Sequence, residues 1–257
     1  MGFDNLKVTF VLEGDGILYD KFNPIHLDGV IDWALSPMNR IVEKLKNTGE
    51  DPCDYGVSVD ACSYDKIPPP ERDGKPYEFP LPLKNRIICG HKVYHASALF
   101  PQGGEEETIQ YFRTKFPQEF IIDCTGSVNL QSGLTRDHNR PYTVTLCREM
   151  IGYCVGNFKR IRQVFYKTHG ENGELLPEKL LKVRGLDKKR NRGLGGISDI
   201  MVEKVDYDWS VTKDGKAQRY LPDSDGMRIC RVRPPYWNIY GAINCCDIGD
   251  VVTKGTK

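Results

Sequence analysis

The residues best suited to bind a ligand lie in one short stretch in the second half of the chain. The sequence KKRNRGLGG combines four cations with three glycines: Lys188, Lys189, Arg190 and Arg192, then Gly193, Gly195 and Gly196. Glycine has no Cβ, so its backbone N–H can approach a phosphate closely, while lysine and arginine supply positive charge. The stretch therefore predicts a loop that grips a nucleic-acid backbone without reading the bases. The alternative is an ordinary solvated loop, because runs of basic residues are common on protein surfaces.

Two further groups of basic residues extend this prediction. One is the segment GLTRDHNRPY, whose Gly, Asp, Asn and Pro content predicts a loop and which carries Arg136, His138 and Arg140. The other is the start of an expected helix, with Lys159, Arg160 and Arg162. A nucleotide-binding loop is excluded, since the order G-x-x-x-x-G-K-[ST] is absent and the glycines precede a strand instead of a helix.

Histidine provides the candidate for catalysis. A metal-independent ribonuclease needs a general acid or base, and His26 at the start of the first expected helix is best placed for that role. The favoured reading is that His26 only packs or caps the helix start, because no partner side chain can be assigned to it. His91 and His95 would lie about 13 Å apart on one face of a strand, too far to share a metal.

Other residues give no sign of a cofactor or a metal. No C-x-x-C pair exists, and Cys230, Cys245 and Cys246 are expected to be small buried residues. Trp33, Trp209 and Trp237 are expected in a core or an interface more than on nucleobases.

Composition limits the class of protein. The 257 residues carry a formal charge of +1, so no global basic field indicates nucleic acid, and electrostatic binding must come from local clusters. The nine cysteines have no regular spacing, and the start of the chain lacks the pattern of a secretory signal. No apolar run approaches the ~20 residues of a membrane span. These features predict a reduced, cytoplasmic protein that does not enter a membrane.

Periodicity predicts the elements that position the basic loop. Strands are expected at 6–14, within 86–100, 119–133 and 142–156, and from residue 197. Helices are expected from residue 26 to Pro37, at 39–47, and from Asn157, as an N-cap, to Gly170 as a stop. In the last strand, Ile197, Asp199 and Met201 should alternate with Ser198, Ile200 and Val202. The Pro-rich region 49–82 predicts a long surface loop.

This order predicts an α+β fold of the ferredoxin-like, or RRM-like, βαββαβ plan. The chain 1–257 is then one elaborated domain, with a core at about 5–210, insertions near 49–82 and 131–142, and a C-terminal extension at 211–257. The glycine-rich loop joins the second helix to the last strand, so it lies at one end of the sheet.

The motifs and their order resemble those of one family. The segments PIHLDGVIDWAL, GNFKRIRQVF, KKRNRGLGGISDIMVEKVDYDWS and GMRICRVRPPYW are similar to the RAMP superfamily of CRISPR-associated proteins. Within that superfamily the order resembles the subunit of type IV CRISPR effector complexes that binds the five-prime handle of the guide RNA. The resemblance covers the first forty residues and much of 125–237.

The resemblance implies a non-catalytic protein without a cofactor. Its partners would be the guide RNA (crRNA), the neighbouring backbone subunit and the large subunit, and it would help position target DNA. The insertion around 131–142 would correspond to the thumb-like hairpin of these proteins. Two alternatives stay open: a metal-independent endoribonuclease that processes pre-crRNA, with His26 as its first candidate, and an interaction module that mimics a CRISPR subunit.

Overall fold

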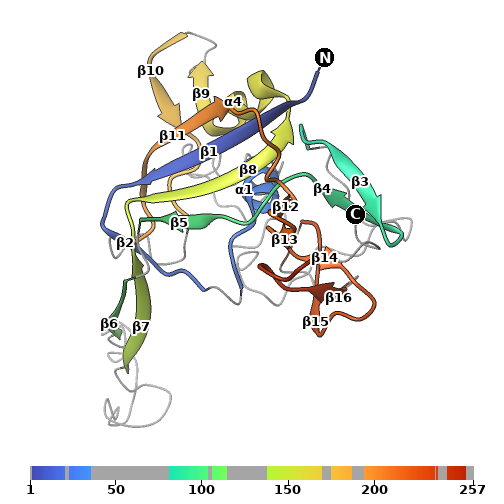
Figure 1. Cartoon of the computed structure of the whole chain (residues 1–257). Coiled ribbons are helices and arrows are strands. Elements are labelled where there is room, and N and C mark those ends of the chain that lie inside the picture. The colour runs from blue at the N-terminus through green and yellow to red at the C-terminus, as the bar shows by residue number, and fades with distance from the viewer. Residues whose placement is uncertain are drawn as a thin grey trace, which may run out of the picture.

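The protein is strand-rich, and its sheets are mostly antiparallel. The computed structural model describes residues 2–20, 23–35, 81–103, 106–114, 138–169, 175–186, 194–234, 236 and 242–252. Within these ranges it contains two short helices, α1 (Leu27–Leu35) and α4 (Phe158–Phe165), among many strands. The class is therefore mixed α and β, as the sequence predicts (Figure 1).

A four-stranded antiparallel sheet is the centre of the molecule. Its strands are β1 (Asp4–Leu12), β5 (Phe100–Gln102), β8 (Glu149–Gly156) and β11 (Ile197–Lys204), in the spatial order β11-β1-β8-β5. Strand β1 pairs with β8 from Asp4 opposite Gly156 to Val11 opposite Glu149. Along the chain, α1 lies between β1 and β5, and α4 lies between β8 and β11.

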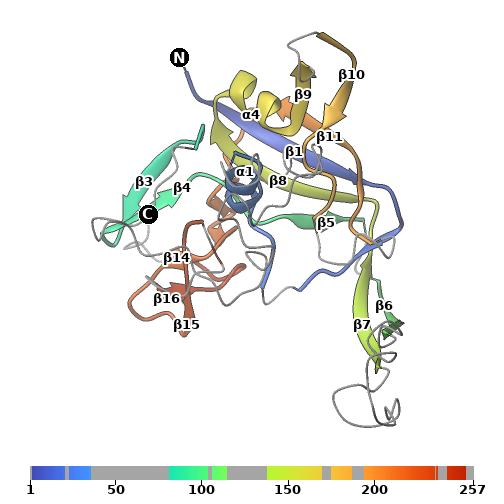
Figure 2. The same cartoon turned by 180° about the vertical axis from the view of Figure 1, so that it is seen from behind.

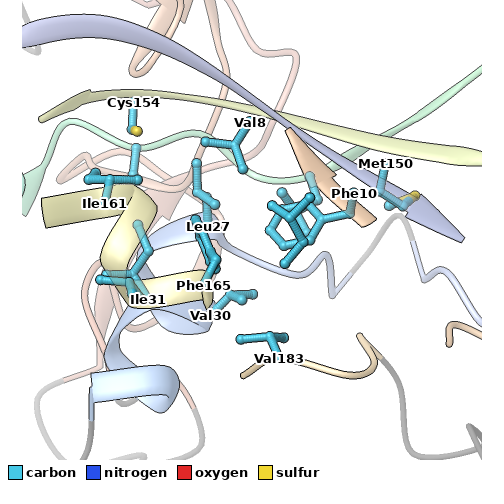
Figure 3. Packing of buried hydrophobic residues seen from close by; sticks show 14 of the residues in the cluster. Val8, Phe10, Leu27, Val30, Ile31, Met150, Cys154, Ile161, Phe165 and Val183 are labelled. Atoms are coloured by element: carbon cyan, nitrogen blue, oxygen red, sulfur yellow. The ribbon is translucent and has the colours of Figure 1, made fainter. Parts of the chain in front are cut away.

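Both helices pack against the same face of this sheet. Side chains at alternate positions of β1, from Leu6 to Leu12, are buried and form one core cluster with residues of both helices. Phe10 meets Phe165 of α4 edge to face, with ring centroids 5.6 Å apart, and Figure 3 shows Leu27, Ile31 and Ile161 in the same core. The core thus buries the apolar stripes that periodicity identifies.

The start of α4 follows the prediction, but its end does not. The side chain of Asn157 accepts a hydrogen bond from the N–H of Arg160 at 3.0 Å, which confirms the predicted N-cap. The helix ends at Phe165 instead of Gly170, because Tyr166–His169 form strand β9, which pairs with β10 (Leu175–Leu181).

The last strand of the sheet contains an irregularity that changes its faces. Val11 pairs with Asp199 but Leu12 pairs with Ile197, so Ser198 is an extra residue on β11. Ile197 and Ile200 both enter the core as a result. The predicted strict alternation from Ile197 is therefore wrong.

A hairpin projects from one end of the sheet. Strand β7 (His138–Leu146) pairs with β6 (Glu107–Thr114), and it also pairs with β2 (Gly16–Ile17) at its sheet end. Figures 1 and 2 show β6 and β7 extending away from the rest of the molecule. His138 to Pro141, predicted as loop, are strand residues, because the chain pairs along its whole length with β6.

Other predicted strands divide into shorter pieces. The predicted strand at 142–156 is two strands, because the chain turns at Cys147 and Arg148 between β7 and β8. The predicted strand at 86–100 contains the hairpin of β3 (Asn85–Ile88) and β4 (His91–Tyr94), followed by β5. Cys89 at φ 47° and Gly90 at φ 78° make its turn. The elements predicted at 39–47 and 119–133, and the loop at 49–80, lie outside the described residues.

The C-terminal part builds a second core. Its strands are β12 (Thr212–Lys213), β13 (Lys216–Ala217), β14 (Leu221–Pro222), β15 (Arg228–Cys230) and β16 (Ile243–Cys246). Their buried side chains, including Cys245 and Cys246, pack with Ile88 and Val93 of the β3–β4 hairpin. The prediction of buried small residues is confirmed for Cys245 and Cys246, whereas Cys230 is only half-buried.

Candidate nucleic-acid interface

Gly16 is the point where the glycine-rich segment meets the projecting hairpin. The N–H of Gly195 donates to the carbonyl of Gly16 at 3.1 Å, and Gly16 itself pairs with Leu146 of β7. Beside them, the N–H of Glu13 donates to the carbonyl of Gly196 at 2.8 Å. We call this place the Gly16 junction, meaning the β1–β2 turn with the segments 146–148 and 194–196.

The glycines of the junction serve packing. Gly195 has a φ of 61°, where a side chain is disfavoured. A Cβ on Gly196 would lie 2.5 Å from Oε2 of Glu13. Both residues are buried, and the Gly195 N–H is already bonded to Gly16. In this conformation the Gly195 N–H is therefore used within the fold.

The two ends of the predicted basic loop are held side by side. The N–H of Leu186 donates to the carbonyl of Gly195 at 2.9 Å, and the N–H of Ile197 donates to the carbonyl of Arg184 at 3.2 Å. Lys188, Lys189, Arg190, Arg192 and Gly193 connect these anchored ends but lie outside the described residues. The chain therefore leaves and re-enters the fold at the Gly16 junction.

Two cations at the junction were not singled out in the sequence. Arg148 lies in the β7–β8 turn, where its carbonyl accepts from the N–H of Leu12 at 2.8 Å. Its side chain is 84% exposed and pairs with Asp15 at 3.2 Å. Arg184 is also exposed, and the residue after it, Gly185, forms a β-bridge with Gly196. No local pattern marks these residues, because strand pairing alone brings them to one place.

The cations of α4 lie at the other end of the sheet. Lys159, Arg160 and Arg162 are exposed, and the helix starts directly after Gly156, which pairs with Asp4. The junction lies beyond Leu12, roughly 25 Å away along β1 at the rise of a strand. The α4 cations are thus separated by most of the length of β1 from the anchored ends of the basic loop.

The third predicted group lies along the hairpin. His138 pairs with Thr114 and Arg140 pairs with Phe112, so both residues belong to β7, with His138 at its end away from Gly16. Arg136 lies outside the described residues. A ligand that touches both the hairpin and the basic loop would therefore pass the junction.

His26 is enclosed at the start of α1. Its side chain is buried, its ring stacks on Tyr236 with centroids 4.4 Å apart, and Tyr220 is 5.1 Å away. Among the described residues neither ring nitrogen has a hydrogen-bond partner. Burial, and then the charge of Arg219, lower the pKa of His26 well below 6.5. The ring is therefore neutral and has no described neighbour with which to exchange a proton.

A second cluster has the residue types of a hydrolase but not the geometry. The Nδ1 atom of His95 lies 3.3 Å from Oγ of Ser210 and 3.5 Å from Oδ2 of Asp208. A catalytic triad needs the serine and the carboxylate on different ring nitrogens. Here both lie at Nδ1, and the Ser210 hydroxyl donates to Asp208 at 2.5 Å. The cluster instead fixes the segment around Asp208.

His91 and His95 do not share a strand face. His91 is exposed in β4, whereas His95 is buried beyond the end of that strand. Among the described residues no three His, Cys, Asp or Glu side chains gather closely enough to hold a metal ion. In the same ranges, no helix combines the length and apolarity needed to cross a membrane.

Comparison with known proteins adds no assignment. No protein-family model and no curated protein matches the chain.

Proposed function

We propose that the protein is a non-catalytic RNA-binding subunit that holds the five-prime handle of the guide RNA in a type IV CRISPR ribonucleoprotein complex. The observation that carries the proposal is the Gly16 junction. It places the ends of the basic glycine-rich loop, two exposed arginines and the root of the projecting hairpin at one end of the central sheet. An RNA strand held there meets cations from several segments, and phosphate binding needs such charge more than any particular base contact.

The topology supports a ferredoxin-like fold of the RAMP type. In chain order the central strands are β1, β5, β8 and β11, so the spatial order β11-β1-β8-β5 reads fourth, first, third, second. The two helices follow the first and third of these strands and contact one face. The glycine-rich segment precedes the fourth strand, and the β6–β7 hairpin projects as a thumb-like element would (Figure 1).

The surroundings of His26 favour binding over cleavage. A general base must reach the 2′-hydroxyl of the RNA, but His26 is buried between tyrosine rings. We expect His26→Ala to leave guide-RNA maturation intact, and the purified protein not to cut repeat RNA in EDTA. Specific cleavage that His26→Ala abolishes would instead make the protein a processing endoribonuclease.

The proposal is tested by the RNA that the protein carries. The chain is co-expressed with its neighbouring genes, and the RNA that copurifies with it is sequenced. We expect guide RNA with a defined five-prime handle, together with the backbone and large subunits. An interaction module that mimics a CRISPR subunit would copurify with the subunits but carry no RNA of its own when they are absent.

The basic loop is tested by its charge. Changing Lys188, Lys189, Arg190 and Arg192 to alanine should weaken RNA binding and reduce its salt dependence, by a slope of about 0.7 for each lost phosphate contact with a single strand. Replacing the four by glutamine while keeping Gly193 to Gly196 is a matched variant that preserves the packing of the junction. An unchanged slope in both variants would place the loop away from the RNA.

A further inference from the structure

A stack of aromatic side chains covers part of the sheet face opposite the helices. Tyr153 of β8 pairs with Lys7, so its side chain points away from the core that contains Cys154. The chain after β11 crosses this side and brings Trp209 to Tyr153, with ring centroids 5.2 Å apart at 77°. Tyr207 then lies on Trp209, with centroids 4.0 Å apart at 33°. Figure 1 shows this segment passing from β11 toward β12.

Asp208, the residue between Tyr207 and Trp209, holds these two members of the stack in place. Asp208 accepts hydrogen bonds from the Ser210 hydroxyl at 2.5 Å and the Ser210 N–H at 3.0 Å, and it pairs with buried His95. These contacts fix the backbone between Tyr207 and Trp209, whose rings lie 4.0 Å apart. The rings are therefore presented in a fixed arrangement before any ligand arrives.

Tyr207 forms the open end of this stack. The ammonium of Lys213 lies 4.0 Å from the Trp209 ring centroid, while Tyr207 packs against the same indole. The indole is thus occupied within the protein. Tyr207 is 38% exposed, contacts Tyr153 at its edge, and stacks on Trp209 with one side of its ring. Of the three side chains around the indole, Tyr207 is therefore the exposed ring.

We propose that Tyr207 stacks a nucleobase of single-stranded RNA, as a site separate from the Gly16 junction. This inference rests on the proposed RNA-binding function. A flat neutral ring continues an aromatic stack, and every base has such a face. The ammonium of Lys213 already lies over the Trp209 ring, so the cation–π contact of this cluster is made within the protein. Lys7 lies opposite Tyr153 on the neighbouring strand, 4.0 Å from Glu203, and supplies charge for the adjacent phosphate.

The site requires a single strand. Bases in a duplex are stacked on one another, so their faces are not free for a protein ring. Tyr153 pairs near the start of β1, whereas the junction lies beyond its end. RNA that reached both sites would follow β1 for about 15–20 Å.

The experiment compares Tyr207→Ala, Tyr207→Phe and a control, Phe3→Ala, which removes another exposed ring outside the stack. Binding of single-stranded oligoadenylate and oligouridylate to the full chain is measured over a range of salt concentrations. Loss of one base stack should reduce affinity by about 5- to 150-fold. We expect this loss for Tyr207→Ala, near wild-type affinity for the other two variants, and an unchanged salt slope.

The outcomes separate the two proposals. If the basic-loop variant weakens binding but Tyr207→Ala does not, the stacking site is wrong and the RNA-binding function stands. If the wild-type chain binds no RNA, the proposed function fails as well. Photo-crosslinking of 5-iodouracil RNA to the wild-type chain gives a test that needs no variant to fold. A crosslink on the peptide containing Tyr207 supports the site, and crosslinks found only elsewhere overturn it.

Discussion

Arg219 and Asp28 form a fully buried ion pair between the C-terminal part of the chain and the first helix, with Nη2 and Oδ2 3.1 Å apart. The guanidinium also donates to the carbonyls of Tyr94, Ala96 and Val232, and to the hydroxyl of Tyr236. That hydroxyl lies 2.8 and 2.9 Å from the two Asp28 oxygens. One arginine therefore ties both cores together, and Gly29 leaves room for the Tyr236 ring, 3.1 Å from where a Cβ would stand.

Breaking this pair should destabilise the protein strongly. Asp28→Ala leaves the guanidinium buried without its counter-charge, and loss of one partner of a buried pair costs about 3–5 kcal/mol. Urea denaturation followed by circular dichroism measures the change in the free energy of unfolding. The double change Asp28→Leu with Arg219→Met should be less harmful than Asp28→Ala, since it buries no lone charge. Asp15→Ala, which breaks an exposed pair, should have little effect, and an equal loss there would contradict the prediction.

His26 should make stability fall as the solution becomes acidic. Its pKa in the folded protein is well below 6.5, because burial and Arg219 disfavour the imidazolium. Below about pH 6.5, His26 therefore binds a proton in the unfolded chain but not in the folded one. The free energy of unfolding then falls with decreasing pH, with a limiting slope of about 1.4 kcal/mol per pH unit. His26→Phe keeps a ring against Tyr236 and should reduce this slope between about pH 7 and pH 5. Measuring the free energy of unfolding of both proteins across that range tests the prediction. An unchanged slope would assign the pH dependence of stability to other groups.

The turn before β15 should tolerate no side chain at Gly226. A Cβ there would lie 2.2 Å from the carbonyl oxygen of Cys245, and both sides of this contact are backbone. Gly226→Ala should cost about 1–3 kcal/mol, as other overpacking changes do. Gly2→Ala is the matched control, since nothing lies within 4 Å of its Cβ position. Thermal unfolding compares the two, and equal melting temperatures would show that the strand can shift freely.

The two arginines of the Gly16 junction should contribute to RNA binding. Arg148→Ala combined with Arg184→Ala should lower affinity and reduce the salt slope by up to about 1.4, since each lost contact with a single strand contributes about 0.7. The comparison is a variant with Lys159, Arg160 and Arg162 changed to alanine at the far end of the sheet. A larger slope change in this second variant would place the RNA at α4 instead of the junction. Fluorescence anisotropy at several salt concentrations distinguishes these outcomes.

The sequence alone determined the elements whose pattern is local. Alternation from Leu6 to Leu12 predicts β1, and the apolar stripe of α4 with its Asn157 cap predicts the start of that helix. These patterns are informative because side-chain direction repeats every two residues in a strand and every 3.6 residues in a helix. The spacing of apolar residues therefore shows which face of an element is buried. The sequence also placed the basic loop before the last strand, and the structure anchors its ends there.

Only the tertiary structure decided which distant residues meet. The extra residue Ser198 places Ile197 and Ile200 in one core, which strict alternation does not allow. Arg219 has no sequence feature that marks it as buried, since arginine is ordinarily exposed, and its burial depends on a carboxylate 191 residues away. Strand register likewise brings Arg148 to Gly16, and the path of the chain after β11 brings Tyr207 to Tyr153. Contacts of this kind depend on how the sheet pairs, and periodicity within a segment carries no information about that pairing.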